Sequence, residues 1–153
     1  MESENILTFD LFKGLNPDDM PDLLAVSEEE VYDKGQSIIE ESSPSSDLYV
    51  LLSGKVNVEF EITDYDSDQT ETLQLVMLNE GDIFGEIAFL EKNRRTATVK
   101  AVEETRVLKF DGGKLHEQLG ANHSTGYRVM HNLAVILARR LTRLSMLWLE
   151  CRA

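Results

Sequence analysis

The sequence predicts a mainly β fold of short antiparallel strands with flanking helices. Between residues 31 and 110 the chain alternates short β-rich segments with glycine or polar turns. In residues 56–62 apolar side chains alternate with polar ones, which gives that segment one buried and one solvated face, as in antiparallel sheets. The longest helical pattern follows at residues 124–150. The expected architecture is therefore a set of strands followed by a long helix.

The first expected element is a short helix that ends near residue 25. Asn16 can cap its first turn, Pro17 suits the first helical position, and Asp18 and Asp19 favour the positive end of the helix dipole. The strands expected next have β-branched or aromatic residues and flanking turn signals, and they cover residues 31–32, 37–39, 48–52, 56–62, 72–78, 96–101 and 106–110. The acidic segment 63–69 is predicted to be a hairpin loop and not a metal site, because it lacks the glycine and the distant glutamate of a calcium loop.

A short helix is expected at residues 114–119, and the long helix after it carries two apolar stripes. One stripe has the spacing of a coiled-coil seam and consists of Met130, Ala134, Leu137, Leu141, Leu144, Trp148 and Cys151. The other consists of Val129, Leu133 and Ile136. We expect the second stripe to pack on the β domain and the seam to meet its copy in a homodimer. The alternative is a helix that folds back entirely on its own domain.

The length and composition indicate one structural unit in a reducing compartment. A chain of 153 residues is long enough for one hydrophobic core, with residues 1–120 as the β domain and its N-terminal helix, and residues 121–153 as the dimerisation helix. The lone Cys151 cannot form an internal disulfide, and the N-terminus is acidic where a signal peptide would be basic. No apolar run approaches the roughly 18 residues of a membrane span. We therefore expect a cytoplasmic protein that does not enter a membrane.

The net charge of −13 is unevenly distributed along the chain. Residues 1–90 sum to −19, whereas residues 91–153 sum to +6. A mostly acidic surface repels nucleic acid, so we expect no direct DNA binding. The basic cluster of Lys92, Arg94, Arg95 and Lys100 is instead a place where a small anion could bind by close contacts.

The residues around this cluster predict a site for a cyclic phosphate attached to a sugar. Arg95 offers a planar fork for phosphate oxygens, and Thr96 and Thr98 offer hydroxyls. Gly85 lets backbone approach closely, and a helical turn from Glu86 would aim N–H groups at the anion. Glu86 is negative, so it suits a ribose hydroxyl or Arg95 and not the phosphate.

These residues resemble the phosphate-binding cassette of the cyclic nucleotide-binding domain family. The matching residues are Phe84-Gly85-Glu86, the apolar turn Ile87-Ala88-Phe89-Leu90, and Arg95-Thr96-Ala97-Thr98-Val99. Most of the chain is similar to the catabolite-activator branch of this family, from the helix at residues 12–25 through the strands to the long last helix. The resemblance implies an antiparallel double-stranded β-helix, or jelly roll, followed by a long C-terminal dimerisation helix. It also implies that Glu86 contacts the ribose 2′-hydroxyl, Arg95 the cyclic phosphate, and Thr96 the phosphate or the base, with Gly85, Ile87, Ala88 and Ala97 completing the site.

The chain departs from the family pattern at two places. Arg94 stands where the family often has proline, which adds charge near the phosphate. The two hydroxyl residues that reach the purine in the cAMP-activated branch correspond here to Leu144 and Ser145. Arg94 and Ser145 are therefore additional candidates for ligand contact, and the ligand is expected to be cAMP or cGMP.

Three functional hypotheses follow from these features. The first is a regulatory protein in which a cyclic nucleotide reorients a dimeric C-terminal helix and so changes a surface for an effector. The second is a ligand-free interaction module in which Arg95 and Glu86 form only an ion pair. The third is the sensor fragment of a transcription regulator. We expect no enzyme and no catalytic residues, because no nucleophile, base and orienting group occur at meaningful spacing, and no cofactor or metal site among the histidines.

Overall fold

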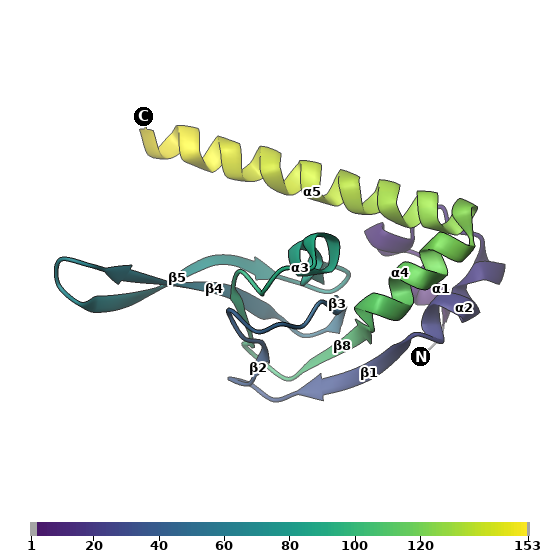
Figure 1. The fold of residues 1–153 in the computed structure, drawn as a ribbon, viewed down its shortest axis with the longest axis horizontal. Helices are drawn as coiled ribbons and strands as arrows, with labels where there is room; N and C mark the ends of the chain where they lie inside the picture. The colour runs from purple at the N-terminus through teal and green to yellow at the C-terminus, as the bar shows by residue number, and fades with distance from the viewer. Residues whose placement is uncertain (1–2, 153) are drawn as a thin grey trace. The chain divides into compact units, whose positions relative to one another are not determined.

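A computed structural model describes residues 3–152, and it confirms the mainly β fold with a long last helix (Figure 1). Residues 1 and 2 of the acidic N-terminus lie outside the described residues. The chain packs as two compact groups of residues. We call residues 22–116 the β unit, and residues 3–21 together with 117–152 the helical unit. The boundary expected at residue 120 remains a prediction.

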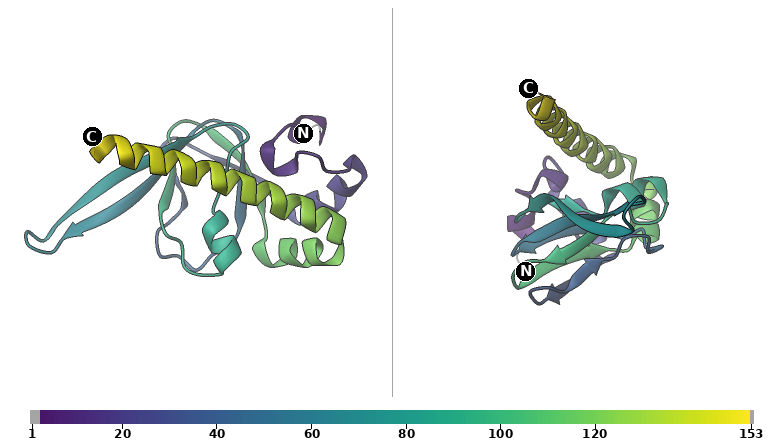
Figure 2. Two further views of the ribbon diagram at one scale, coloured as in Figure 1. Left: turned by 90° about the horizontal axis from the view of Figure 1, so that it is seen from above. Right: turned by 90° about the vertical axis from the view of Figure 1, so that its left-hand side faces the viewer.

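The β unit consists of two four-stranded sheets in which the paired strands are antiparallel. The first sheet contains, in spatial order, β1 (Ser27–Tyr32), β8 (Thr105–Phe110), β3 (Leu48–Ser53) and β6 (Ile83–Phe84). The second contains β2 (Ser37–Ile39), β7 (Thr98–Ala101), β4 (Val56–Asp64) and β5 (Gln69–Leu78). Strand order in both sheets departs from chain order, as expected for the predicted jelly roll. The hairpin of β4 and β5 extends past the other strands of the unit (Figure 2).

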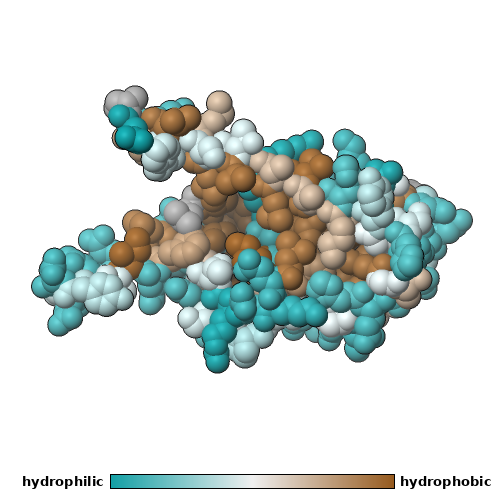
Figure 3. Space-filling model, turned by 45° about the horizontal axis from the view of Figure 1, so that its top comes forward, coloured by the Kyte–Doolittle hydropathy of each residue, from teal (hydrophilic) through white to brown (hydrophobic). Residues whose placement is uncertain are grey.

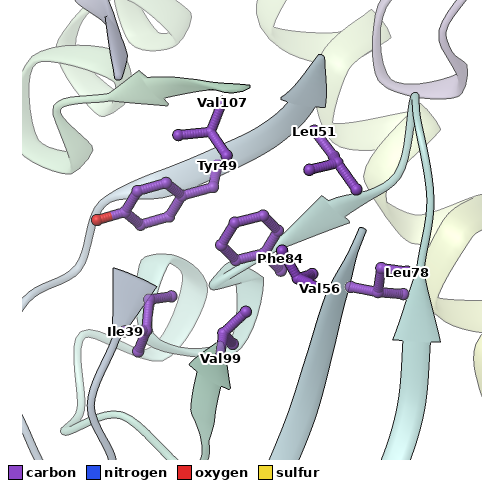
Figure 4. Packing of buried hydrophobic residues seen from close by; sticks show 8 residues of the cluster. All are labelled: Ile39, Tyr49, Leu51, Val56, Leu78, Phe84, Val99 and Val107. Carbon is purple, nitrogen blue, oxygen red and sulfur yellow. The ribbon is translucent and has the colours of Figure 1, made fainter. Parts of the chain in front are cut away.

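The core of the β unit lies between the two sheets (Figure 4). Its buried residues come from both sheets, and they are Ile39, Tyr49, Leu51, Val56, Leu78, Phe84, Val99 and Val107. The rings of Tyr49 and Phe84 stack at 4.9 Å between centroids. Phe84 is the first residue of the predicted cassette, so this core anchors the start of the candidate site.

Strand β1 begins four residues earlier than the sequence predicted. Glu28, Glu29 and Glu30 have low β propensity, so they concealed the strand. In the structure these carboxylates form ion pairs with basic residues of β8: Arg106 pairs with Glu29, and the Lys109 Nζ lies 3.8 Å from Glu28 and 3.4 Å from Glu30. Cross-strand ion pairs therefore stabilise an edge strand whose own residues disfavour it.

The acidic segment after β4 is a hairpin turn, as predicted. The Asp64 carboxylate accepts hydrogen bonds from the backbone N–H of Asp66 at 3.0 Å and from the Ser67 hydroxyl at 2.8 Å. These two bonds lower the pKa of Asp64. The aspartate thus closes the turn.

The helical unit begins with short elements at the N-terminus. These are α1 (Ser3–Ile6), η1 (Asp10–Phe12), η2 (Pro17–Asp19) and α2 (Met20–Leu24), the last of which continues into the β unit. Asn16 caps η2 as predicted, since its Oδ1 accepts the Asp18 N–H at 3.0 Å. The first turn of the predicted helix is, however, a 3-10 turn.

Two helices follow the strands: α4 (Gly112–Ala121) and α5 (His123–Arg152). The second apolar stripe of α5, Val129, Leu133 and Ile136, is buried. Within the helical unit α5 packs against η1, and the buried Asn132 Nδ2 donates to the carbonyls of Leu11 at 2.8 Å and Lys13 at 2.9 Å. The sequence analysis did not predict η1, and packing of the stripe on the β domain remains a prediction.

The C-terminal half of α5 carries large apolar side chains that are exposed in the single chain (Figure 3). On the predicted seam, Leu141 is 66% exposed, Leu144 50% and Trp148 58%. Among the described residues, no helix is both long enough and apolar enough to cross a membrane.

Candidate functional site

A left-handed glycine turn connects strand β6 to the short helix α3 (Glu86–Glu91). Gly85 has a φ of +79°, a conformation that residues with a side chain rarely adopt. A Cβ atom at this position would lie 2.8 Å from Nη1 of Arg95 and 2.9 Å from the Asp47 carbonyl oxygen. Glycine is therefore required both by the backbone conformation and by the close approach of Arg95.

Arg95 is the buried centre of the candidate site, with 4% of its surface exposed. Its Nη1 donates to the Gly85 carbonyl at 2.9 Å. Its Nη2 donates to the Asp47 carbonyl at 2.7 Å and to the Ser45 hydroxyl at 3.1 Å. The guanidinium carbon lies 5.9 Å from the centroid of the Tyr49 ring. The arginine is thus held by backbone and side-chain groups from the turn before α3 and the loop before β3.

One nitrogen of this guanidinium has no acceptor. Nε of Arg95 is buried and, among the described residues, has no hydrogen-bond partner. Burial lowers the pKa of Arg95, whereas Tyr49, Asp47 and Glu86 act in the opposite direction. An arginine remains protonated in proteins, so the site contains a buried positive charge with an unused N–H donor.

The chain around Arg95 is tied to the loop between β2 and β3. The Arg95 N–H donates to the Ser43 carbonyl at 2.9 Å, and the Ser42 N–H donates to the Arg95 carbonyl at 2.9 Å. Arg94 is exposed, and its Nη1 donates to the Ser42 carbonyl at 2.8 Å. Arg94 therefore acts here on the loop, with its charge close to that of Arg95.

Helix α3 presents its first turn next to this arginine. The Phe89 N–H donates to the Gly85 carbonyl at 3.2 Å, which starts the helical hydrogen bonding. The N–H groups before that point have no acceptor inside the helix, as in every helical first turn. Ala88 and Phe89 are buried, which fixes the helix against the β unit. The turn can therefore contribute backbone donors to an anion beside Arg95.

The structure brings together most of the residues predicted for the site. Gly85, Glu86, Ile87, Ala88, Arg94, Arg95, Thr96 and Ala97 all lie on α3, on its preceding turn, or on the loop before β7. Glu86 is half-buried and interacts electrostatically with Arg95, while Thr96 is exposed. Ser145 is exposed on α5 in the helical unit, and its contact with a ligand remains a prediction.

The Thr98 hydroxyl accepts a hydrogen bond from the protein and keeps its own proton as a donor, so its contact with phosphate remains a prediction. Its Oγ1 accepts the Glu41 N–H at 3.0 Å. The expected strand at residues 96–101 begins only at Thr98, so Thr96 and Ala97 belong to the preceding loop. Thr98 therefore connects β7 to the segment that follows β2, and Thr96 is the exposed hydroxyl next to Arg95 in the chain.

Sequence reasoning missed the acceptors of the arginine, Ser45 and Asp47. They precede Arg95 by 50 and 48 residues and belong to no motif. The only signal in the sequence is a serine-rich loop before a buried strand, which does not specify a partner. The described residues also contain no group of three or more His, Cys, Asp or Glu side chains arranged to hold a metal ion.

Comparison with known proteins identifies the class to which this fold and site belong. Residues 29–122 match the family model described as "Cyclic nucleotide-binding domain". The chain is 34% identical over 131 residues to the cyclic AMP receptor protein of Thermus thermophilus, covering 86% of this chain and 56% of that protein. It is also 34% identical to the cGMP-dependent protein kinase egl-4 of Caenorhabditis elegans, over 63% of this chain and 12% of the kinase. The chain thus spans about half, or less, of the length of these relatives.

Solved structures show the same similarity. The catabolite activator protein of Thermus thermophilus matches 93% of this chain with a TM-score of 0.74 and 30% identity, and 62% of that chain is covered. A putative cyclic nucleotide-binding protein from Geobacter metallireducens matches 92% of this chain and 99% of its own, with a TM-score of 0.74 and 25% identity. The chain belongs to the cyclic nucleotide-binding domain family and is similar to its catabolite-activator-like regulators. The resemblance drawn from the cassette residues is confirmed.

Proposed function

We propose that the chain binds a cyclic mononucleotide, cAMP or cGMP, at the cassette and acts as a regulatory sensor. The observation that carries this proposal is the buried Arg95, whose Nε has no acceptor among the described residues. An unsatisfied buried donor costs about 1–3 kcal/mol, and more when the group is charged. A phosphate oxygen would satisfy this donor and neutralise the buried charge.

Each predicted residue then has a defined role toward the ligand. Arg95 and the N–H groups of the first turn of α3 bind the cyclic phosphate, and the exposed Thr96 is next to it. The half-buried Glu86 accepts a hydrogen bond from the ribose 2′-hydroxyl. Gly85 provides the space that brings Arg95 close to the turn. Arg94 holds the loop and adds positive charge, and Ser145 contributes a hydroxyl to the purine.

In the proposed sensor, ligand binding changes the arrangement of the two α5 helices of a homodimer, and this change is the output. The exposure of Leu141, Leu144 and Trp148 in the single chain supports a homodimer that covers them. Ligand binding changes the helix arrangement only if the ligand binds one arrangement more tightly than the other. The changed dimer surface is then available to a protein effector, in a protein that we place in the cytoplasm.

One observation favours a second function. Three N–H groups of Arg95 already have protein acceptors, which is also what a purely structural arginine would show. A ligand-free interaction module therefore remains the alternative. Relatives in which the matched region is just over half of the sequence, among them a transcriptional regulator, support a further version in which this chain is the sensor part of a transcription regulator.

Calorimetric titration with cAMP and cGMP separates the sensor from the ligand-free module. We expect the parent protein to bind at least one nucleotide, and Arg95→Lys to bind it roughly 100-fold more weakly, because lysine cannot make the planar fork. The matched control is Arg106→Lys, at a surface arginine paired with Glu29, which should bind as the parent does. The absence of heat with both nucleotides in the parent protein would exclude the sensor.

A further inference from the structure

The Ser45 hydroxyl contacts the guanidinium of Arg95, although Ser45 lies outside the cassette residues. It belongs to the loop before β3 and is half-buried. Its Oγ accepts a hydrogen bond from Nη2 of Arg95 at 3.1 Å. Its distance to Oδ2 of Asp47 is 3.5 Å, which is long for a hydrogen bond between oxygens. The hydroxyl proton of Ser45 is therefore weakly engaged.

A count of the N–H groups of Arg95 shows why this contact matters. Arginine has five N–H groups: one on Nε and two on each terminal nitrogen. Nη2 uses both of its hydrogens, for the Asp47 carbonyl and for Ser45, while Nη1 uses one for the Gly85 carbonyl. The remaining donors are Nε–H and the second hydrogen of Nη1.

These two donors cannot hold a phosphate together. In a guanidinium, the Nε–H shares an edge with Nη2, whereas Nη1 lies on the opposite side, next to Cδ. Each edge that can bind an anion through two parallel hydrogen bonds therefore includes Nη2. A phosphate that binds Arg95 in this two-point manner must replace either the Asp47 carbonyl or the Ser45 hydroxyl on Nη2.

Ser45 is the acceptor that can be replaced. Its bond to Nη2 is longer than that of the Asp47 carbonyl, 3.1 Å against 2.7 Å. The Asp47 carbonyl belongs to the backbone that leads directly into the buried strand β3, whereas a serine hydroxyl can rotate. A hydroxyl is also both donor and acceptor, so it can turn its proton toward the oxygen that replaces it.

We propose that Ser45 is an additional ligand-binding residue: its hydroxyl gives up its bond from Nη2 of Arg95 when the cyclic phosphate binds, and it then donates a hydrogen bond to the phosphate. The inference rests on the proposed function, because it concerns the same ligand. It adds a contact from a distant loop. In the exchange, Nη2 of Arg95 passes from an uncharged hydroxyl to an anionic oxygen, and the Ser45 hydroxyl gains an ionised acceptor.

The test compares Ser45→Ala with Ser45→Thr and with Ser46→Ala, using titration with cAMP and cGMP. Ser45→Ala should bind roughly tenfold more weakly, since it loses a hydrogen bond to a charged group. Ser45→Thr keeps the hydroxyl and should recover most of the affinity. Ser46→Ala is the matched control, one residue further along the same loop, and should bind as the parent does.

The two phosphorothioate diastereomers of the bound nucleotide distinguish a direct contact from a general effect on the loop. Each diastereomer replaces one of the two exocyclic phosphate oxygens with sulfur, a poorer acceptor. A direct hydrogen bond predicts that the effect of Ser45→Ala largely disappears with one diastereomer and persists with the other. Circular dichroism melting of each variant would verify that all of them are folded.

Three results would overturn the proposal. Equal affinity of Ser45→Ala and the parent protein excludes the contact while leaving the sensor function intact. An equal loss with both diastereomers and the unmodified nucleotide shows that Ser45 acts only on the loop. A parent protein that binds neither nucleotide removes the proposed function, and this inference with it.

Discussion

His116 on α4 is hydrogen-bonded to Phe89, near the end of helix α3: its Nε2 lies 2.8 Å from the Phe89 carbonyl oxygen. The two rings also stack, with centroids 4.2 Å apart and an angle of 18° between their planes. Phe89 is completely buried, and His116 is half-buried. Helix α3 is therefore attached to the β unit at both ends, through Gly85 and Arg95 at its start and through His116 near its end.

Replacing the His116 side chain should weaken the packing of α3 on the β unit. We expect His116→Ala to lower the free energy of unfolding by about 1–2 kcal/mol, through loss of one hydrogen bond and one aromatic contact. Urea denaturation provides the measurement. The control is His131→Ala, because His131 is exposed and its ring centroid lies 5.8 Å from that of Tyr127. Its effect should stay within about 0.5 kcal/mol; equal losses in both variants would contradict the assigned role.

Gly85→Ala should be more damaging than an equivalent change at another glycine with positive φ. Gly35 is the matched control, because its φ is +88° and a Cβ atom there would meet nothing within 4 Å. Both alanine variants strain the backbone, by about 1–3 kcal/mol. Only Gly85→Ala also pushes against Arg95, so it should lose at least about 1 kcal/mol more in urea denaturation. Equal stability of the two variants would show that the arginine adapts freely.

The proposed dimer predicts different effects for two neighbouring exposed residues on α5. Leu144 lies on the seam and is 50% exposed, whereas Met146 lies off the seam and is 62% exposed. Sedimentation equilibrium should show a dimeric parent, a monomeric Leu144→Asp variant and a dimeric Met146→Asp variant, because only the first buries a charge in the interface. If the parent is a monomer at high concentration, the seam has another partner. If both variants remain dimeric, the interface uses another face of the helix.

The buried tyrosine beside Arg95 predicts a loss of stability at alkaline pH. Burial raises the pKa of Tyr49, so the folded protein favours the protonated phenol more than the unfolded chain does. This contribution is fully present below the unfolded pKa of about 10 and is lost as the pH rises above it. Urea denaturation between about pH 9 and pH 11 should therefore show a less steep decline for Tyr49→Phe than for the parent. Parallel declines would contradict the prediction.

Much of the fold was predictable because local sequence patterns determine where several of its strands and helices form. The alternation in residues 56–62, the cap at Asn16 and the long apolar periodicity of α5 each correspond to an element in the structure. Strand β1 was predicted too short because its glutamates are poor strand residues, and their ion pairs with basic residues of β8 form only in the folded sheet. The two-residue strand β6 has no pattern long enough to recognise.

The candidate site was predicted as a set of residues but not as a set of contacts. Sequence spacing placed Gly85, Glu86, Arg95 and Thr96 in one cassette, and these residues lie on the glycine turn, α3 and the loop before β7. It did not predict that the Thr98 hydroxyl accepts the Glu41 N–H. Contacts between distant segments cannot be read from local spacing, because packing of the two sheets decides which loops meet.

The sequence by itself determined the family, the strand-rich architecture, the long helix and the residue types of the cassette, since each depends on local order along the chain. Only the tertiary structure decided how Arg95 is held. Its guanidinium donates to carbonyls and a hydroxyl from segments 10 to 50 residues away, and one buried nitrogen remains without an acceptor among the described residues. The physical reason is that a buried charge must find its hydrogen-bond acceptors wherever the fold places them.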